Sequence, residues 1–199
     1  RLASPSNPTG SSIAPYELRK THEVVKAPGG LTIVDEIYLG LSYDETYGQT
    51  ALAIDENIIS INSFSKYFNM TGWRLGWAVV PEALVPAIER LAQNLFICAS
   101  TISQHAALAC FAPESIAEYE RRRAEFKARR DYFIPALEAL GMPVPVTPDG
   151  AFYAWADCTQ AAQKLGVAGS WDFAYAVMER AHLAITPGRD FGTQDTGRF

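Results

Sequence analysis

The residues best suited to chemistry lie in four short patterns. The clearest is Ser63-Phe64-Ser65-Lys66, in which two hydroxyls and a primary amine follow an apolar run. A lysine amine can attack a carbonyl group and can also carry a proton between atoms. An isolated lysine is more often an exposed loop residue, so the pattern is informative only together with the other three.

A carboxylate, a phenol and a guanidinium accompany this amine. Asp35 ends an apolar run, and Tyr38 follows it three residues later. Arg74 comes eight residues after Lys66 and lies between glycines, which let the backbone approach a ligand closely. A guanidinium presents a planar fork of donors that suits phosphate oxygens. Read singly, the carboxylate and phenol could be structural, and the glycines could mark a bulge before a strand.

The fourth pattern is the turn of residues 4–10, SPSNPTG. Its prolines stiffen the chain around Asn7, which follows a presumed strand and precedes a predicted helix. Taken alone, this segment is more simply interpreted as a plain turn.

The elements that must position these groups alternate short apolar runs with helical patterns, which predicts an α/β fold with a mostly parallel sheet. Strands are predicted at 31–34, 58–62 and 76–80, and helices at 15–26, 82–96 and 101–111. In open α/β sheets, ligands collect where the strands end. Asp35 and Ser63 come at the ends of two predicted strands, so we expect both at that edge.

A smaller second unit is predicted beyond a long amphipathic helix at 113–140. It would contain a strand at 151–156, a helix at 171–181 and a strand at 183–186. The boundary is placed inside the long helix, which gives domains of 1–117 and 118–199.

Composition favours small-molecule chemistry. With 48% apolar and 20% charged residues, the 199-residue chain can bury a sizeable core. A net charge of -5 argues against a nucleic-acid partner and against a basic surface for binding membranes. The three cysteines lack metal-ligand spacing, so no metal site is expected. No run approaches a membrane span or a secretion signal, which makes a cytoplasmic location the default expectation. Both ends of the chain read as cuts through a longer protein.

Together, the four patterns closely resemble the signature of the class I/II aminotransferases, the fold-type I, aspartate aminotransferase-like enzymes that use pyridoxal 5'-phosphate. The most specific part is Ser63-x-Ser65-Lys66 followed by Arg74 within Gly-x-Arg-x-Gly. The resemblance extends over essentially the whole chain. It implies the carboxy-terminal half of such an enzyme: part of the large domain, with a mostly parallel sheet flanked by helices, and a small α/β domain truncated at its end.

The resemblance implies that Lys66, Asp35 and Tyr38 are catalytic. Lys66 would hold the cofactor as a Schiff base and then move the Cα proton of the substrate. Asp35 would pair with the pyridine nitrogen and keep it protonated. Tyr38 and Asn7 would hydrogen-bond to the ring oxygen of the cofactor.

The cofactor phosphate would be held by Arg74, Ser63 and Ser65, of which Ser63 is the more securely assigned serine. Family members also carry a phosphate-binding loop and a stacking aromatic ring before the Asn7 turn, and an arginine for the substrate carboxylate beyond Phe199. None of these is found in the present sequence, so we expect residues 1–199 alone to be inactive.

The implied activity moves an amino group between an amino acid and a 2-oxo acid, in a homodimer whose sites are shared across the interface. Two alternatives stay open. A C–S lyase of the same fold would share these cofactor residues, and a sensor domain of a transcription regulator could bind the cofactor without turnover. The sequence does not identify the substrate.

Overall fold

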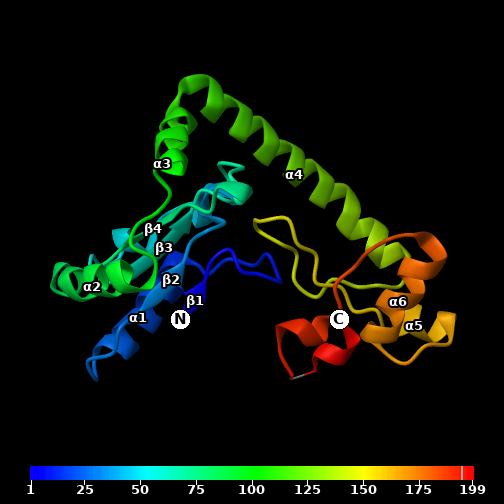
Figure 1. Ribbon diagram of the computed structural model, residues 1–199. Coiled ribbons are helices and arrows are strands. Elements are labelled where there is room, and N and C mark those ends of the chain that lie inside the picture. Colours follow the sequence, from blue (N-terminus) through cyan, green and yellow to red (C-terminus); the bar gives the residue numbers. More distant parts are fainter. Residues whose placement is uncertain (194) are drawn as a thin grey trace. The chain divides into compact units, whose positions relative to one another are not determined.

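The computed structural model describes residues 1–193 and 195–199, which form two compact units (Figure 1). Unit 1 consists of Arg1–Asn7, Ser11–Lys127 and Asp149–Ala151, and unit 2 of Pro8–Gly10, Ala128–Pro148 and Phe152–Phe199. The division lies within one long helix, as does the predicted boundary at residue 117. The assignment of 1–117 and 118–199 to two domains stays a prediction.

Unit 1 is built on a four-stranded sheet in the order β1-β2-β3-β4. Its strands are β1 (Leu2–Ala3), β2 (Ile33–Asp35), β3 (Ile59–Ser63) and β4 (Gly76–Val79). The first three run parallel, and β4 is antiparallel to β3. The three strands predicted from apolar runs are found within two residues of their predicted bounds, and the mostly parallel sheet is confirmed.

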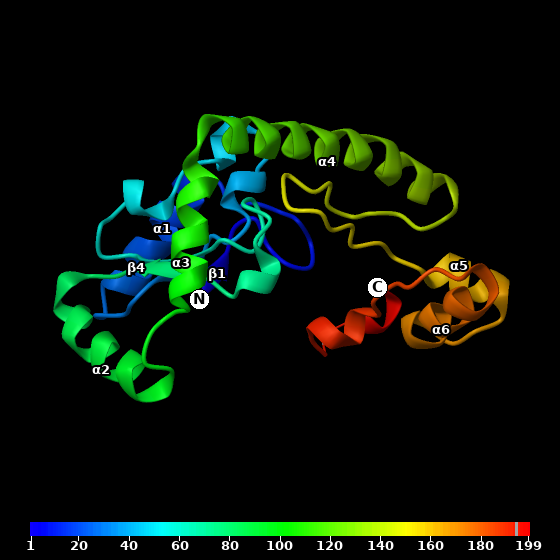
Figure 2. The same cartoon turned by 45° about the horizontal axis from the view of Figure 1, so that its top comes forward.

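Helices flank this sheet, as a second view of unit 1 shows (Figure 2). They are α1 (Pro15–Lys26), α2 (Val85–Leu95), α3 (Thr101–Leu108) and α4 (Pro113–Ala139), which continues into unit 2. The predicted helices at 82–96 and 101–111 each contain a 3₁₀ turn, at Glu82–Leu84 and Ala109–Phe111. Other 3₁₀ turns are Leu39–Leu41, Glu45–Tyr47, Ala51–Ala53, Thr71–Trp73, Gly188–Phe191 and Thr196–Arg198.

The core beneath β2 joins α1 to the sheet through Leu18, Val34, Ala51 and Ile58, all buried. A second buried group packs the loop after β3 against α3 through Phe64, Met70, Leu75, Ala107 and Cys110. The end of β2 is therefore packed against α1, and the loop that follows β3 is packed against α3.

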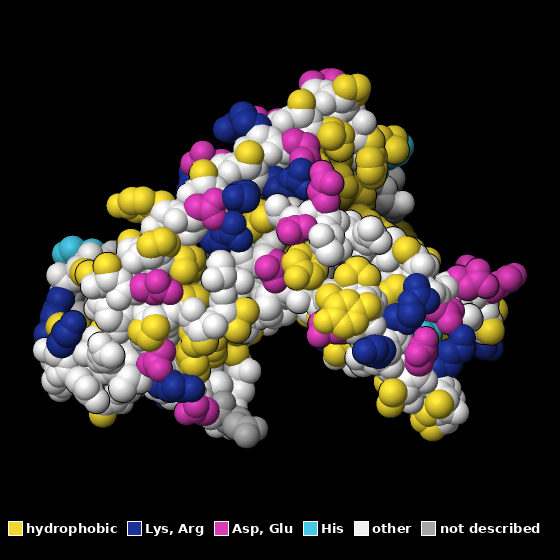
Figure 3. Space-filling view, turned by 180° about the vertical axis from the view of Figure 1, so that it is seen from behind, with side chains coloured by type: hydrophobic (Ala, Val, Ile, Leu, Met, Phe, Trp, Pro, Cys, Tyr) yellow, Lys and Arg dark blue, Asp and Glu magenta, His cyan; other side chains and the backbone are white. Residues whose placement is uncertain are grey.

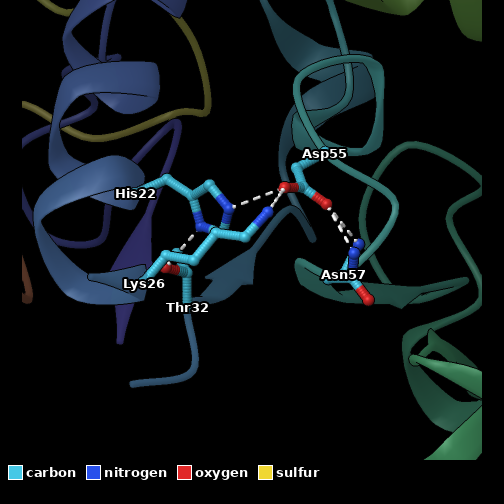
Figure 4. Close-up of polar contacts among 5 residues, drawn as sticks. All are labelled: His22, Lys26, Thr32, Asp55 and Asn57. Atoms are coloured by element: carbon cyan, nitrogen blue, oxygen red, sulfur yellow. Dashed lines mark hydrogen bonds and ion pairs between the residues drawn. The ribbon is translucent and has the colours of Figure 1, made fainter. Parts of the chain in front are cut away.

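A polar cluster fixes the far end of α1 (Figure 4). The buried His22 ring contacts Thr32 Oγ1 at 2.9 Å and Asp55 Oδ2 at 3.1 Å. Lys26 Nζ lies 2.6 Å from the same Asp55 oxygen, and Asn57 N donates to Asp55 Oδ1 at 2.8 Å. Both ring nitrogens of His22 are thus engaged, and the cluster ties α1 to the chain on either side of β2.

The secondary structure of unit 2 differs in part from the predicted one. Helix α6 (Ser170–Ala181) confirms the helix expected at 171–181, and α5 (Thr159–Leu165) was not anticipated. The strands predicted at 151–156 and 183–186 are wrong, because residues 151–152 form a turn and the other residues of both segments belong to no strand of the described chain. Alternating apolar residues account for burial of side chains, but they do not supply a neighbouring strand for the backbone groups.

Many large apolar side chains are exposed, as seen on one face in Figure 3. They are frequent on α2 and just after it, where Leu91, Leu95 and Ile97 are 60%, 76% and 78% exposed. None of the helices in the described part of the chain is long and apolar enough to cross a membrane.

Candidate active site

The strand ends bring the predicted residues to one edge of the sheet. Asp35 ends β2, where it is paired with Ala3 of β1 and Ile61 of β3. Ser63 ends β3 and is paired with Gly76 of β4. Because β4 runs in the opposite direction, its first residue lies at this edge. Segments that are far apart in the sequence therefore reach the same place.

The Asp35 side chain is half-buried and accepts hydrogen bonds from two donors. Arg1 Nη2 lies 2.7 Å from Asp35 Oδ2, and the Ile37 backbone N–H donates to Oδ1 at 3.4 Å. The carboxylate thus already holds a cationic N–H donor. A protonated pyridine nitrogen would be a donor of the same kind.

Tyr38 and Lys66 come together from different strand ends. Tyr38 is buried, with 4% of its surface exposed, and Lys66 is partly buried. The Lys66 ammonium nitrogen lies 5.6 Å from the centre of the Tyr38 ring. The amine therefore lies over the Tyr38 ring, which follows the end of β2 at Asp35 by three residues.

The loop from Ser63 to Gly76 carries the candidate phosphate-binding groups. Ser63 Oγ accepts a hydrogen bond from Ser65 N at 3.0 Å, and Thr71 Oγ1 donates to Ser65 O at 2.6 Å. Arg74 is exposed in a left-handed conformation, with φ of 52°, and its Nη1 donates to Thr71 O at 2.8 Å. Thr71 therefore connects the serine segment to the arginine, a positioning role that the sequence did not assign.

Asn7 is exposed in a loop that a hydrogen bond from Ser6 N to Ser11 O, 2.9 Å long, closes. It follows β1 and so leaves the same edge of the sheet as Asp35. Its role toward a cofactor stays a prediction.

Glu36 is a further residue for which no role was predicted. Although acidic, it is only 3% exposed. Its carboxylate accepts hydrogen bonds from Ser60 Oγ at 2.6 Å, Ala51 N at 2.6 Å and Thr50 Oγ1 at 2.9 Å. Glu36 therefore secures the end of β2 directly beside Asp35. A glutamate inside an apolar run is the signal that could have pointed to such buried donors.

Comparison with known proteins places the chain among enzymes of one family. The family model for aminotransferase class I and II matches residues 2–199. The valine–pyruvate aminotransferase of Mycobacterium tuberculosis is 38% identical over 200 residues, covering 100% of this chain and 50% of that protein. An aspartate aminotransferase of Bacillus sp. strain YM-2 is 35% identical, covering 100% of this chain and 51% of that protein.

Comparison with solved structures also finds aminotransferases. An aminotransferase from Mycobacterium tuberculosis has a TM-score of 0.91 at 37% identity, covering 100% of this chain and 50% of that chain. An aromatic aminotransferase from Pyrococcus horikoshii has a TM-score of 0.85 at 31% identity, covering 96% of this chain and 51% of that chain. The present chain spans about half the length of the curated relatives it matches.

Proposed function

The chain belongs to the class I and II aminotransferases, a family that depends on pyridoxal 5'-phosphate, and we propose that the whole protein moves an amino group between an amino acid and a 2-oxo acid. The observation that carries this proposal is the approach of the Lys66 amine to within 5.6 Å of the centre of the Tyr38 ring, at the edge of the sheet where β2 ends with Asp35. This is the edge at which α/β folds bind their ligands.

The residues present suit the cofactor. The cationic donor held by Asp35 supports pairing of this carboxylate with a protonated pyridine nitrogen. The guanidinium of Arg74 offers the donor geometry that phosphate requires. Ser63, at the end of β3, and Ser65, in the loop that follows, would supply hydroxyl donors.

When bound, pyridoxal phosphate supplies a ring that accepts the electron pair left by the departing Cα proton. The chain's own residues hold and move that proton. The Lys66 amine is the group that would take it from Cα, and Asp35 would keep the ring nitrogen charged. Tyr38 and Asn7 would donate hydrogen bonds to the ring oxygen. The Tyr38 side chain is buried, which restricts the directions from which it can donate.

The substrate class is proposed as an amino acid and a 2-oxo acid without a finer choice. The names of the relatives include a valine–pyruvate and an aspartate aminotransferase, so similar chains act on different side chains. We also propose a homodimer, since symmetric pairs are the commonest assemblies of soluble enzymes.

The test is chemical labelling of the full-length protein. Borohydride reduction in the presence of pyridoxal phosphate, followed by peptide mapping, should place a pyridoxyl group on Lys66. Lys66→Arg should abolish the label, and Lys20→Arg, which changes an exposed lysine on α1, should retain it. A label on another lysine would refute the assignment.

The outcome of the half-reaction tests the reaction type separately. Incubation of the loaded protein with candidate amino acids should produce pyridoxamine phosphate and the matching 2-oxo acid. Pyruvate and ammonia without pyridoxamine phosphate would instead indicate a lyase.

A further inference from the structure

Tyr67, the residue directly after Lys66, is held on two sides. Its ring lies against Gly40, where an added Cβ would stand 2.6 Å from the Tyr67 Cγ. Its hydroxyl donates to Glu120 Oε1 on α4 at 2.5 Å. The residue that follows the reactive lysine is thus in contact with the turn after Tyr38 and with a long helix.

Helix α4 also makes a second contact with the turn that follows Tyr38. Glu120 forms an ion pair with Arg123 one turn later, and Arg123 Nη1 lies 3.5 Å from the backbone oxygen of Ser42. Ser42 directly follows the 3₁₀ turn Leu39–Leu41, which begins next to Tyr38. A path of contacts therefore runs from Tyr67, next to Lys66, through Glu120 and Arg123 of α4 to the turn that follows Tyr38.

Packing and charge favour the protonated form of Tyr67, which donates to Glu120. The Tyr67 ring also packs against Tyr119 and Phe68, with centroids 5.3 Å and 5.1 Å apart. Burial and the neighbouring Glu120 carboxylate raise the pKa of Tyr67 to about 12. The phenol therefore stays protonated and keeps donating to Glu120 at any pH near neutrality.

We propose that Tyr67 and Glu120 are positioning residues that hold the Lys66 segment at a fixed distance from Tyr38. The proposal rests on the function proposed above for Lys66. A lysine side chain has a flexible four-carbon stem, so the position of its amine depends on where its backbone is held. Small displacements of reacting groups lower rates steeply, which makes such an anchor consequential.

The experiment uses the full-length protein loaded with pyridoxal phosphate and two conservative variants. Tyr67→Phe keeps the ring and removes the hydroxyl, and Glu120→Gln keeps the size and removes the charge. The matched control is Glu118→Gln, which removes a carboxylate on α4 that pairs with Arg121 and Arg122 instead. The readouts are the pH titration of the cofactor's visible absorption, the single-turnover rate with an amino acid, and the melting temperature.

Both variants should shift the midpoint of the absorption titration and slow the single turnover by about tenfold, with a smaller change in KM. Glu118→Gln should leave the midpoint and the rate unchanged. A lower melting temperature with wild-type midpoint and rate in both variants would overturn the proposal, because the path would then be merely structural. Should Tyr67→Phe fail to fold, Glu120→Gln decides by the same criteria.

Borohydride mapping of the wild-type protein separates the two proposals. A label on Lys66 together with unchanged titration midpoints in the variants would refute the positioning role and leave the proposed function intact. Absence of the label from Lys66 in the wild-type protein would refute both.

Discussion

Among single residues, Asp35 and Arg74 carry opposite charges at the same edge of the sheet and should serve the cofactor differently. Asp35 is half-buried and holds a cation, whereas Arg74 is exposed at the end of a loop. The first would act on the electronic state of the ring, and the second would act on how tightly the phosphate is held.

In the full-length protein, Asp35→Asn should leave the cofactor bound and slow Cα-proton removal by about 10²-fold or more, because a neutral amide does not stabilise a pyridinium charge. Arg74→Ala should mainly weaken cofactor affinity, by about tenfold or more, since one charged phosphate contact is lost. Cofactor titration and single-turnover kinetics measure both effects. Equal losses of affinity in the two variants would contradict this division of roles.

Glu36 gives a prediction about stability. Glu36→Ala should lower the free energy of unfolding by about 3 kcal/mol, because the buried Ser60 hydroxyl, the partly buried Thr50 hydroxyl and the Ala51 N–H lose their common acceptor. Urea unfolding monitored by fluorescence measures the change. Glu56→Ala, which truncates an exposed glutamate, is the control and should change stability little. Equal effects of the two substitutions would show that the donors find other partners.

The placement of the candidate residues at strand ends could be predicted from the sequence because strand ends and turn residues are local features, whereas their roles rest on the family resemblance. Asp35, Ser63 and Lys66 follow apolar runs, and such runs predict strands that lead to one edge. The partners of Glu36 could not be selected, since Thr50 and Ser60 are brought to it only by the folded chain.

At the scale of the secondary-structure elements, local patterns could again be predicted, but partners that are distant in the sequence could not. Unit 1 was largely predictable, since its apolar runs lie between turns and α1 begins at a proline. The direction of β4 was not, because the chain between Ser63 and Gly76 is too irregular to show whether it crosses over or folds back. In unit 2, apolar alternation at 151–156 and 183–186 suggested strands, but a strand also requires a partner for its backbone.

The cluster that fixes α1 gives a prediction about pH. The hydrogen bond from Lys26, followed by those from Asn57 and His22, holds the pKa of Asp55 well below its ordinary value of 3.8. A carboxyl group whose pKa is lowered on folding stabilises the protein above its unfolded pKa. That contribution is lost as the pH falls through the folded pKa.

Asp55→Asn should therefore lower the free energy of unfolding at pH 7, and the difference from wild type should shrink as the pH falls below 3.8. Urea unfolding at pH 7, 5 and 3 tests this. Glu23→Gln, an exposed change on α1, should show no such trend. A difference that stays constant down to pH 3 would mean that the charge of Asp55 is not what stabilises the cluster.

At the scale of the whole molecule, the exposed apolar surface on and after α2 is unusual for a free-standing protein. Leu91, Leu95 and Ile97 are each 60% exposed or more, and Ile102 and Leu108 on α3 are 72% and 71% exposed. Exposed apolar side chains in such number promote association.

A polypeptide limited to residues 1–199 should therefore self-associate and should not convert pyridoxal phosphate to pyridoxamine phosphate, even at saturating cofactor. The amino acid must be oriented for its Cα proton to leave, and the family resemblance places the carboxylate-binding arginine outside this range. Light scattering and the half-reaction, compared with the full-length protein, check both points. A monomer with full-length conversion rates would contradict them.

The contact between Gly40 and Tyr67 also constrains how this protein can evolve. A Cβ at position 40 would stand 2.6–2.9 Å from three atoms of the Tyr67 side chain, so a larger residue there requires the tyrosine to shift. A larger residue at position 40 is therefore accommodated more readily in a lineage that already has a small residue at 67. The two positions, 27 residues apart in the sequence, therefore constrain each other's substitutions.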